Sequence, residues 1–154
     1  MREKQNNILW YIALPLLVGI ISGLWGRNGM REFENMNQPP LSPPGWVFPI
    51  VWIILYILMG VASYLVAQSG EKGRGEAIFF YLLQLVVNFF WTPIFFVAGW
   101  YLFAFFWLIL LWVLIYACIQ RFYPIDKRAS YLMLPYLAWV TFAGYLNFSV
   151  FLLN

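Results

Sequence analysis

The sequence predicts an all-α protein, a bundle of five transmembrane helices that forms a single membrane domain over residues 1–154. Its residues are 64% hydrophobic and only 10% charged, whereas a soluble domain carries about a quarter charged residues. Residues 77–120 contain no Asp, Glu, Lys or Arg. Because about 20 apolar residues cross a bilayer as a helix, this stretch alone is long enough for two spans.

The first span is predicted at about residues 8–25, after the polar start "MREKQNN" and before "GRNG". A cleaved signal peptide is the alternative, since basic residues precede an apolar run. The run is long for a signal peptide, contains Pro15 and ends in the bulky Trp25 without a small-residue cleavage site. We therefore interpret it as a transmembrane helix.

An ordered first loop is predicted at residues 27–45, and the second span follows at about 46–67. The loop contains "NQPPLSPPG", whose prolines fix φ and push each preceding residue toward extended geometry. The second span stops at "QSGEKGRGE", where glycines and charges are typical of a turn at the membrane surface.

The remaining spans are predicted at about residues 77–97, 100–122 and 129–153. Ala98 and Gly99 give the only plausible break in the long uncharged stretch, so the third and fourth helices should form a tight antiparallel hairpin.

The basic residues predict the orientation in the membrane. Five spans place the termini on opposite sides. The N-terminal side would carry Arg2, Lys4, Lys72, Arg74, Arg121, Lys127 and Arg128. The other side would carry only Arg27 and Arg31. The positive-inside rule then predicts a cytoplasmic N-terminus and an outward-facing first loop and C-terminus.

Several function classes are excluded because the residues and motifs that they require are missing from this sequence. There is no histidine, and the single cysteine, Cys118, lies in an apolar stretch. Motifs for hydrolases, zinc enzymes and phosphate loops are missing, and the predicted spans contain no acidic residue for proton coupling. The net charge of +3 is confined to loops and termini. We therefore expect no metal site, no required cofactor and no nucleic-acid partner.

Polar residues in the third span are spaced as one helix face: Gln84, Asn88 and Thr92 stand four residues apart, and Trp91 shares that side. Hydrogen bonding between helices is the simpler interpretation, and we favour it for Gln84 and Thr92. For Asn88, ligand binding is an equal alternative.

Aromatic and small residues are spaced similarly in two other spans. The fifth span has Tyr136, Trp139, Ala143 and Asn147 at steps of three, four and four, and the second has Trp52 and Tyr56 one turn apart. A flat, largely apolar ligand needs such neighbours from its pocket. Five other tryptophans are interpreted as interface anchors or lipid-facing bulk: Trp10, Trp25, Trp100, Trp107 and Trp112. Gly19 and Gly23 form a G-x-x-x-G that packs against a partner chain or within the bundle.

Three stretches together resemble the translocator protein family, also called tryptophan-rich sensory proteins or TspO. They are "PPGWVFPIVWIILYILMG", "QLVVNFFWTPIFF" and "LPYLAWVTFAGYLNFSVFLLN". The similarity runs over nearly the whole chain and implies a five-helix membrane bundle, usually homodimeric, here in a bacterial cell membrane. It further implies binding of porphyrins such as protoporphyrin IX and of isoquinoline or benzodiazepine-type drugs.

The resemblance implies a ligand site formed by Trp52, Asn88, Trp91, Trp139, Ala143 and Asn147, to which spacing adds Tyr56. Without histidine, haem iron lacks its commonest protein ligand, so we expect metal-free porphyrin as ligand or substrate. Light-dependent porphyrin degradation, with Trp52 and Trp139 as catalytic redox partners, is a second hypothesis. A transporter or a stress-regulatory sensor for tetrapyrroles or sterol-like lipids is the alternative.

The chain departs from the family in its first loop. Relatives often read "WYxxLxKP" where this chain reads "EFENMNQP", so Glu32, Phe33 and Gln38 stand in place of Trp, Tyr and Lys. Contacts between the loop and ligand carboxylates are therefore not carried over. The C-terminal "LNFSVFLLN" also lacks the tyrosine and basic residue of the animal cholesterol motif.

Overall fold

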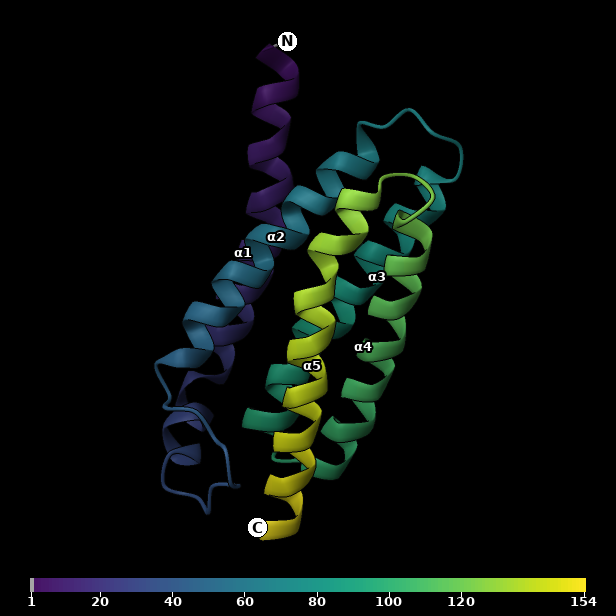
Figure 1. The fold of residues 1–154 in the computed structure, drawn as a ribbon. Coiled ribbons are helices and arrows are strands. Elements are labelled where there is room, and N and C mark those ends of the chain that lie inside the picture. Colours follow the sequence, from purple (N-terminus) through teal and green to yellow (C-terminus); the bar gives the residue numbers. More distant parts are fainter. Residues whose placement is uncertain (1) are drawn as a thin grey trace.

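The computed structural model describes residues 2–154, with side chains from residue 8 onward, and it confirms the five-helix prediction (Figure 1). The helices are α1 (Arg2–Phe33), α2 (Val47–Ala67), α3 (Arg74–Thr92), α4 (Tyr101–Phe122) and α5 (Lys127–Leu153), with a short π-helical turn η1 (Pro93–Val97) after α3. No strand occurs within these described residues. All five helices are long and apolar enough to cross a membrane, with α1 counted from Ile8 and α3 extended through η1.

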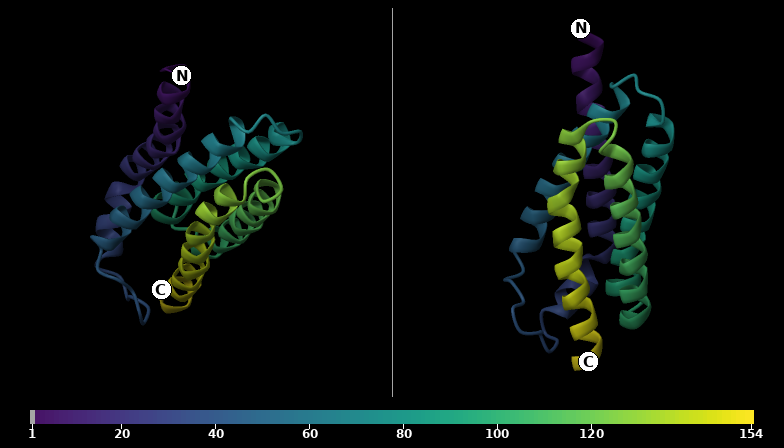
Figure 2. Two further views of the ribbon diagram at one scale, coloured as in Figure 1. Left: turned by 45° about the horizontal axis from the view of Figure 1, so that its top comes forward. Right: turned by 45° about the vertical axis from the view of Figure 1, so that its right-hand side comes forward.

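The helices form a closed ring. α1 packs on α2 and on α3, α2 packs on α5, α5 on α4, and α4 on α3. α2 and α3 also touch across the middle. The views in Figure 2 show the resulting elongated bundle, with the two termini at opposite ends. Its centre is filled by large side chains that are at most 2% exposed, among them Met59, Tyr81, Ile115 and Tyr136.

The first helix is longer than predicted, and the prediction of a loop over 27–45 was wrong at its start. α1 continues to Phe33, so the first loop comprises residues 34–46. The glycines of "GRNG" do not end the helix, because Gly26 and Gly29 allow close packing. A Cβ on Gly26 would lie 2.6 Å from Cγ2 of Thr92, and one on Gly29 would collide with the carbonyl of Phe96. This contact with the α3–η1 segment outweighs the cost of about 1 kcal/mol for glycine in a helix.

The predicted hairpin between the third and fourth spans is confirmed. Helix α4 begins at Tyr101, after a break at residues 98–100 in which Gly99 has a φ of +69°. The amide of Ala98 donates to the carbonyl of Pro93 at 2.9 Å, which closes the wider π-type turn. Single π-turns are frequent at functional sites.

Two tryptophans predicted to be interface anchors or lipid-facing bulk also join helices through their indole N–H groups. Trp107 and Trp112 are half-buried against the core. Their indole N–H groups donate to the carbonyl of Val87 at 2.7 Å and to Oγ1 of Thr141 at 2.8 Å. These two hydrogen bonds were not predicted, because hydropathy does not separate lipid-facing indoles from those that join helices. Trp10, Trp25 and Trp100 are exposed as expected.

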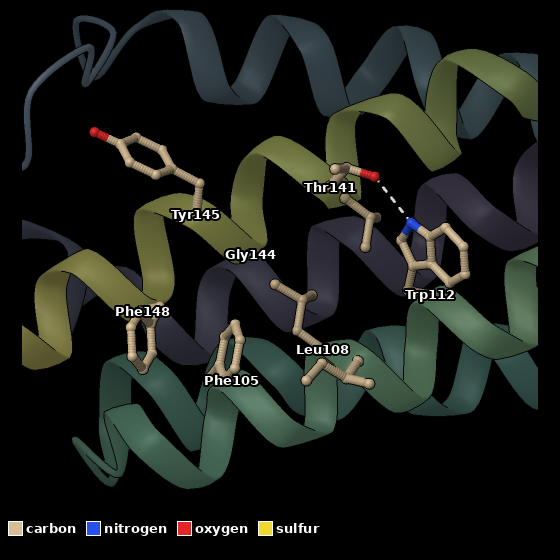
Figure 3. A pocket seen from close by; sticks show the side chains of 9 residues that line it. Phe105, Leu108, Trp112, Thr141, Gly144, Tyr145 and Phe148 are labelled. Carbon is tan, nitrogen blue, oxygen red and sulfur yellow. Dashed lines mark hydrogen bonds between the residues drawn. The ribbon is translucent and has the colours of Figure 1, made fainter.

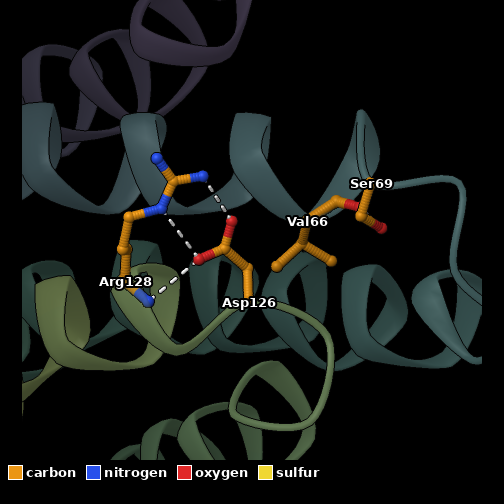
Figure 4. A network of polar contacts seen from close by, with 4 residues as sticks. All are labelled: Val66, Ser69, Asp126 and Arg128. Carbon is orange, nitrogen blue, oxygen red and sulfur yellow. Dashed lines mark hydrogen bonds and ion pairs between the residues drawn. The ribbon is translucent and has the colours of Figure 1, made fainter.

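An aspartate fixes the start of α5. Asp126 accepts the backbone N–H of Arg128 at 2.9 Å, and the Arg128 guanidinium bonds the same carboxylate at 2.9 Å (Figure 4). The hydrogen bond from the Arg128 side chain is the main reason that the pKa of Asp126 is lowered. The cap satisfies one of the free N–H groups at the helix start.

Candidate functional site

Four buried polar side chains form one hydrogen-bonded network across α2, α3 and α5. The Tyr56 hydroxyl donates to Oδ1 of Asn88 at 2.8 Å, and Nδ2 of Asn88 donates to the Tyr136 hydroxyl at 2.7 Å. Tyr136 in turn donates to Oε1 of Gln84 at 2.7 Å. Unpaired polar groups are costly in lipid, so this polar network fixes the relative positions of three helices. For Gln84, bonding between helices is thereby shown. Thr92 instead turns its methyl group toward Gly26.

Trp52 lies against this network. Its ring stacks on Tyr56 with centroids 5.5 Å apart and an interplanar angle of 29°. It meets the ring of Tyr136 nearly edge-on at 6.1 Å. Trp52 and Tyr56 stand one turn apart on α2, so the helix itself places one ring over the other. Trp52 is half-buried, which leaves part of its surface available to a ligand.

Trp139 on α5 presents a buried polar atom without a partner. Its Nε1 is shielded from solvent and has no hydrogen-bond acceptor within the structure. An unmade hydrogen bond of this kind costs about 1–3 kcal/mol. The indole meets Phe48 at 5.8 Å and Phe142 at 5.5 Å between ring centroids. An acceptor atom of a bound molecule could pair with Nε1 only if the side chains that shield it move.

A shallow groove of about 450 Å³ runs along Trp139 between α2 and α5. Apolar side chains line it: Val51, Ile54, Leu55, Leu58, Pro135, Ala138, Trp139 and Phe142. Its size lies within the range of small-molecule sites, about 300–1,000 Å³. We call it the α2/α5 groove.

The other predicted site residues lie nearer the first loop. Trp91 donates from Nε1 to Oδ1 of Asn147 at 3.0 Å, and Asn147 donates to the carbonyl of Tyr101 at 2.8 Å. Trp91 also stacks on Phe95 at 5.1 Å. Trp91 and Asn147 are thus paired with each other, apart from the Tyr56 and Asn88 pair. Ala143 is 8% exposed and stands one turn from both Trp139 and Asn147 on α5.

The first loop is tied across the end of the bundle to α5. The Tyr145 hydroxyl donates to the carbonyl of Pro40 at 2.6 Å. Asn37 donates to the carbonyl of Leu153 at 3.4 Å and accepts from Nδ2 of Asn154 at 3.2 Å. The loop therefore leaves α1, reaches the last turns of α5 and returns to α2, as Figure 1 shows.

A second hollow lies between α4 and α5 (Figure 3). Its volume is about 380 Å³, and its lining includes Phe105, Leu108 and Phe148. Trp112 and Thr141 are joined by their hydrogen bond on its wall. None of the predicted site residues lines it. We call it the α4/α5 groove.

The predicted site set omitted Tyr136, which belongs to the polar network of the candidate site. It joins Asn88 to Gln84 and touches Trp52. Its place three residues before Trp139 was visible in the spacing, but spacing does not reveal which hydroxyl bonds to which amide. Phe48, against Trp139, was likewise not predicted.

Residues 11–153 match the TspO/MBR family. The chain belongs to the TspO/MBR family. This membership, with five apolar helices, makes it an integral membrane protein. The resemblance in the three motif stretches is thereby confirmed.

Relatives of this TspO/MBR chain come from distant organisms. A "Tryptophan-rich sensory protein" of Cereibacter sphaeroides is 40% identical, covering 79% of this chain and 76% of the relative. A "Tryptophan-rich protein TspO" of Chlorobaculum tepidum is 37% identical over 100% of this chain and 99% of its own length. A "Translocator protein" of Bos taurus is 32% identical over 90% and 84%.

Proposed function

We propose that the protein binds a tetrapyrrole in the membrane, with metal-free protoporphyrin IX as the first ligand to test. The observation that carries the proposal is the unpartnered, buried Nε1 of Trp139 beside the α2/α5 groove. Membership in the TspO/MBR family supports a tetrapyrrole-binding or sensory role at the membrane.

The chemistry of the site suits a flat, apolar ring with few polar atoms. Trp139 supplies an aromatic surface and one unpaired donor to the α2/α5 groove. Trp52 is outside the lining of the groove and stacks on Tyr56 in the polar network, so a macrocycle would have to extend beyond the groove to contact it. Among the described side chains no three His, Cys, Asp or Glu residues gather into a metal site. Recognition would therefore rest on apolar burial, stacking and the Trp139 donor. Flat isoquinoline and benzodiazepine-type drugs meet the same requirements.

A titration tests the proposal. Purified protein in detergent is titrated with protoporphyrin IX while tryptophan and porphyrin fluorescence are recorded. Saturable binding is expected, weakened about 5- to 30-fold in Trp139→Phe, because a hydrogen bond between neutral groups and part of a stacked surface are lost, together about 1–2 kcal/mol. Trp10→Phe is the matched control, since Trp10 is 74% exposed on α1. Equal binding by both variants would contradict the proposed site.

A second function, light-dependent degradation of the bound porphyrin, is favoured by the packing of Trp52. Its indole, an oxidisable ring, stacks on the phenol of Tyr56, whose hydroxyl is already hydrogen-bonded to Asn88. Such contacts suit electron transfer from Trp52 or Trp139 to an illuminated porphyrin, with dioxygen as the oxidant that is reduced while the macrocycle is degraded. Absorbance under light separates this from passive binding. Bleaching to a discrete product that Trp52→Phe abolishes supports an enzyme, and bleaching equal to that of free porphyrin refutes it.

A further inference from the structure

Met36 joins the first loop to the start of α4. The Tyr101 hydroxyl donates to the Met36 sulfur at 3.3 Å. Met36 also packs, half-buried, against a small cluster around Phe95. Phe33 and Tyr101 belong to the same cluster, with ring centroids 5.7 Å and 4.9 Å from that of Phe95. The thioether is therefore part of an apolar aromatic contact, although the Met36 side chain as a whole is only half-buried.

The next residue along the chain ties the loop to a second helix. Asn37 bonds to Leu153 and Asn154 at the end of α5. Two consecutive residues thus hold the loop to α4 and α5. Further along, Pro40 bonds to Tyr145, whose ring stacks on Phe142.

The hydrogen bond between Tyr145 and Pro40 connects the loop to the candidate site. Phe142 contacts Trp139 and lines the α2/α5 groove. A shift of the loop away from the bundle would remove the partner of Tyr145 and loosen the aromatic wall beside Trp139. Met36 is therefore connected to the α2/α5 groove through the loop from Met36 to Pro40, and then through Tyr145 and Phe142.

The methionines differ in how far reagents can reach them. Met59 and Met133 are 0% exposed in the core, whereas Met36 and Met30 are half-buried. A hydroperoxide oxidises a thioether in one two-electron step. The sulfur lone pair attacks the terminal oxygen, the O–O bond breaks, the sulfoxide forms, and the peroxide is reduced to water or alcohol. The product is polar and disrupts apolar contacts, and methionine sulfoxide reductases reverse it.

We propose that Met36 is an oxidation site at which a hydroperoxide releases the first loop from the end of the bundle. The sulfoxide places a strong dipole among Phe33, Phe95 and Tyr101, where the thioether made soft apolar contacts. Its effect on a ligand rests on the proposed function; the oxidation and the loop movement do not.

The first arm of the test needs no ligand. Purified protein is treated with hydrogen peroxide, and sulfoxide formation at each methionine is followed by peptide mass spectrometry. The folded protein is then cleaved by a Glu-specific protease after Glu34, an exposed loop residue. We expect Met36 to oxidise well before Met59 and Met133, and cleavage after Glu34 to become several-fold faster. A reductase should restore slow cleavage.

Matched variants decide whether Met36 is responsible. Met36→Leu should abolish the response to peroxide, and Met30→Leu should retain it, because Met30 lies in α1 outside the loop. Oxidation of Met36 no faster than of Met59, or an unchanged cleavage rate after its oxidation, would overturn the inference.

The second arm measures the rate of protoporphyrin release before and after peroxide. Faster release in the wild-type chain and in Met30→Leu, but not in Met36→Leu, supports the coupling to the site. Bound porphyrin whose release is unaffected by Met36 oxidation overturns it. A chain that shows the loop response but binds no porphyrin would refute the proposed function and support the oxidation site.

Discussion

Tyr136 carries the most contacts among the polar residues of the candidate site. Its hydroxyl accepts from Asn88 and donates to Gln84, and its ring borders Trp52. An unpaired polar atom in that interior is costly, because lipid offers no substitute for water. A single oxygen atom thus holds two amides in place behind the tryptophan.

Tyr136→Phe should therefore destabilise the bundle. It leaves Nδ2 of Asn88 and Oε1 of Gln84 without this partner, at a cost of about 1–3 kcal/mol. The measurement is thermal unfolding in detergent. Tyr116→Phe is the control, since Tyr116 is 45% exposed on α4 and keeps its ring stacking on Trp112. Equal melting temperatures for the two variants would show that the polar network contributes nothing to stability.

At the scale of the helix, glycines set how α1 approaches the site. A Cβ on Gly19 would penetrate the ring of Tyr56, whereas one on Gly23 would meet nothing within 4 Å. The G-x-x-x-G motif thus packs within the bundle at Gly19. Helix α1 contributes none of the predicted site residues, yet its glycine allows Tyr56 to occupy the position on which Trp52 stacks.

Gly19→Ala and Gly23→Ala form a matched pair. Gly19→Ala should displace Tyr56, cost about 1–3 kcal/mol as overpacking, and change both tryptophan fluorescence and porphyrin affinity. Gly23→Ala should be neutral or stabilise α1 by up to about 1 kcal/mol, because alanine favours a helix. Unfolding and porphyrin titration of both variants give the comparison. Similar behaviour of the two would contradict the packing of Gly19 on Tyr56.

The start of α5 gives a pH-dependent prediction. The pKa of Asp126 is lowered in the folded chain by its hydrogen bond from Arg128, so its contribution is present above the unfolded pKa of about 3.9 and is lost as pH falls through the folded pKa. Asp126→Asn keeps a capping oxygen but removes the charge. Its deficit should be below about 1 kcal/mol at pH 7, because Arg128 is 75% exposed.

Unfolding of the wild-type chain and Asp126→Asn is compared from pH 7 down to the acid limit of the detergent system. The difference between them should shrink as pH falls below about 4. A difference that stays constant with pH would show that the charge of Asp126 plays no part.

At the scale of the whole molecule, the sequence predicted the features that depend on hydropathy and on residues that interrupt helices. The five spans and the hairpin at Gly99 follow from uncharged stretches and one break. The end of α1 did not follow, because Gly26 and Gly29 read as a turn until their contacts with α3 and η1 are known. Orientation in the membrane stays a prediction.

The candidate site was predictable in part, because residue spacing shows which side chains share a helix face. Spacing selected Trp52, Tyr56 and Asn88, which the fold brings together. It also selected Trp91 and Asn147, which pair with each other nearer the first loop. Periodicity places a residue on a helix face, but the depth of each contact depends on how helices tilt and where Pro93 opens the π-turn.

The central claim is that a porphyrin binds between α2 and α5. The most direct measurement is an experimental structure of the protein with protoporphyrin IX bound. It should show the macrocycle in contact with Trp52 and Trp139, with a ligand acceptor atom within hydrogen-bond distance of Nε1 of Trp139. A macrocycle seated instead in the α4/α5 groove, against Phe105 and Trp112, would contradict the claim.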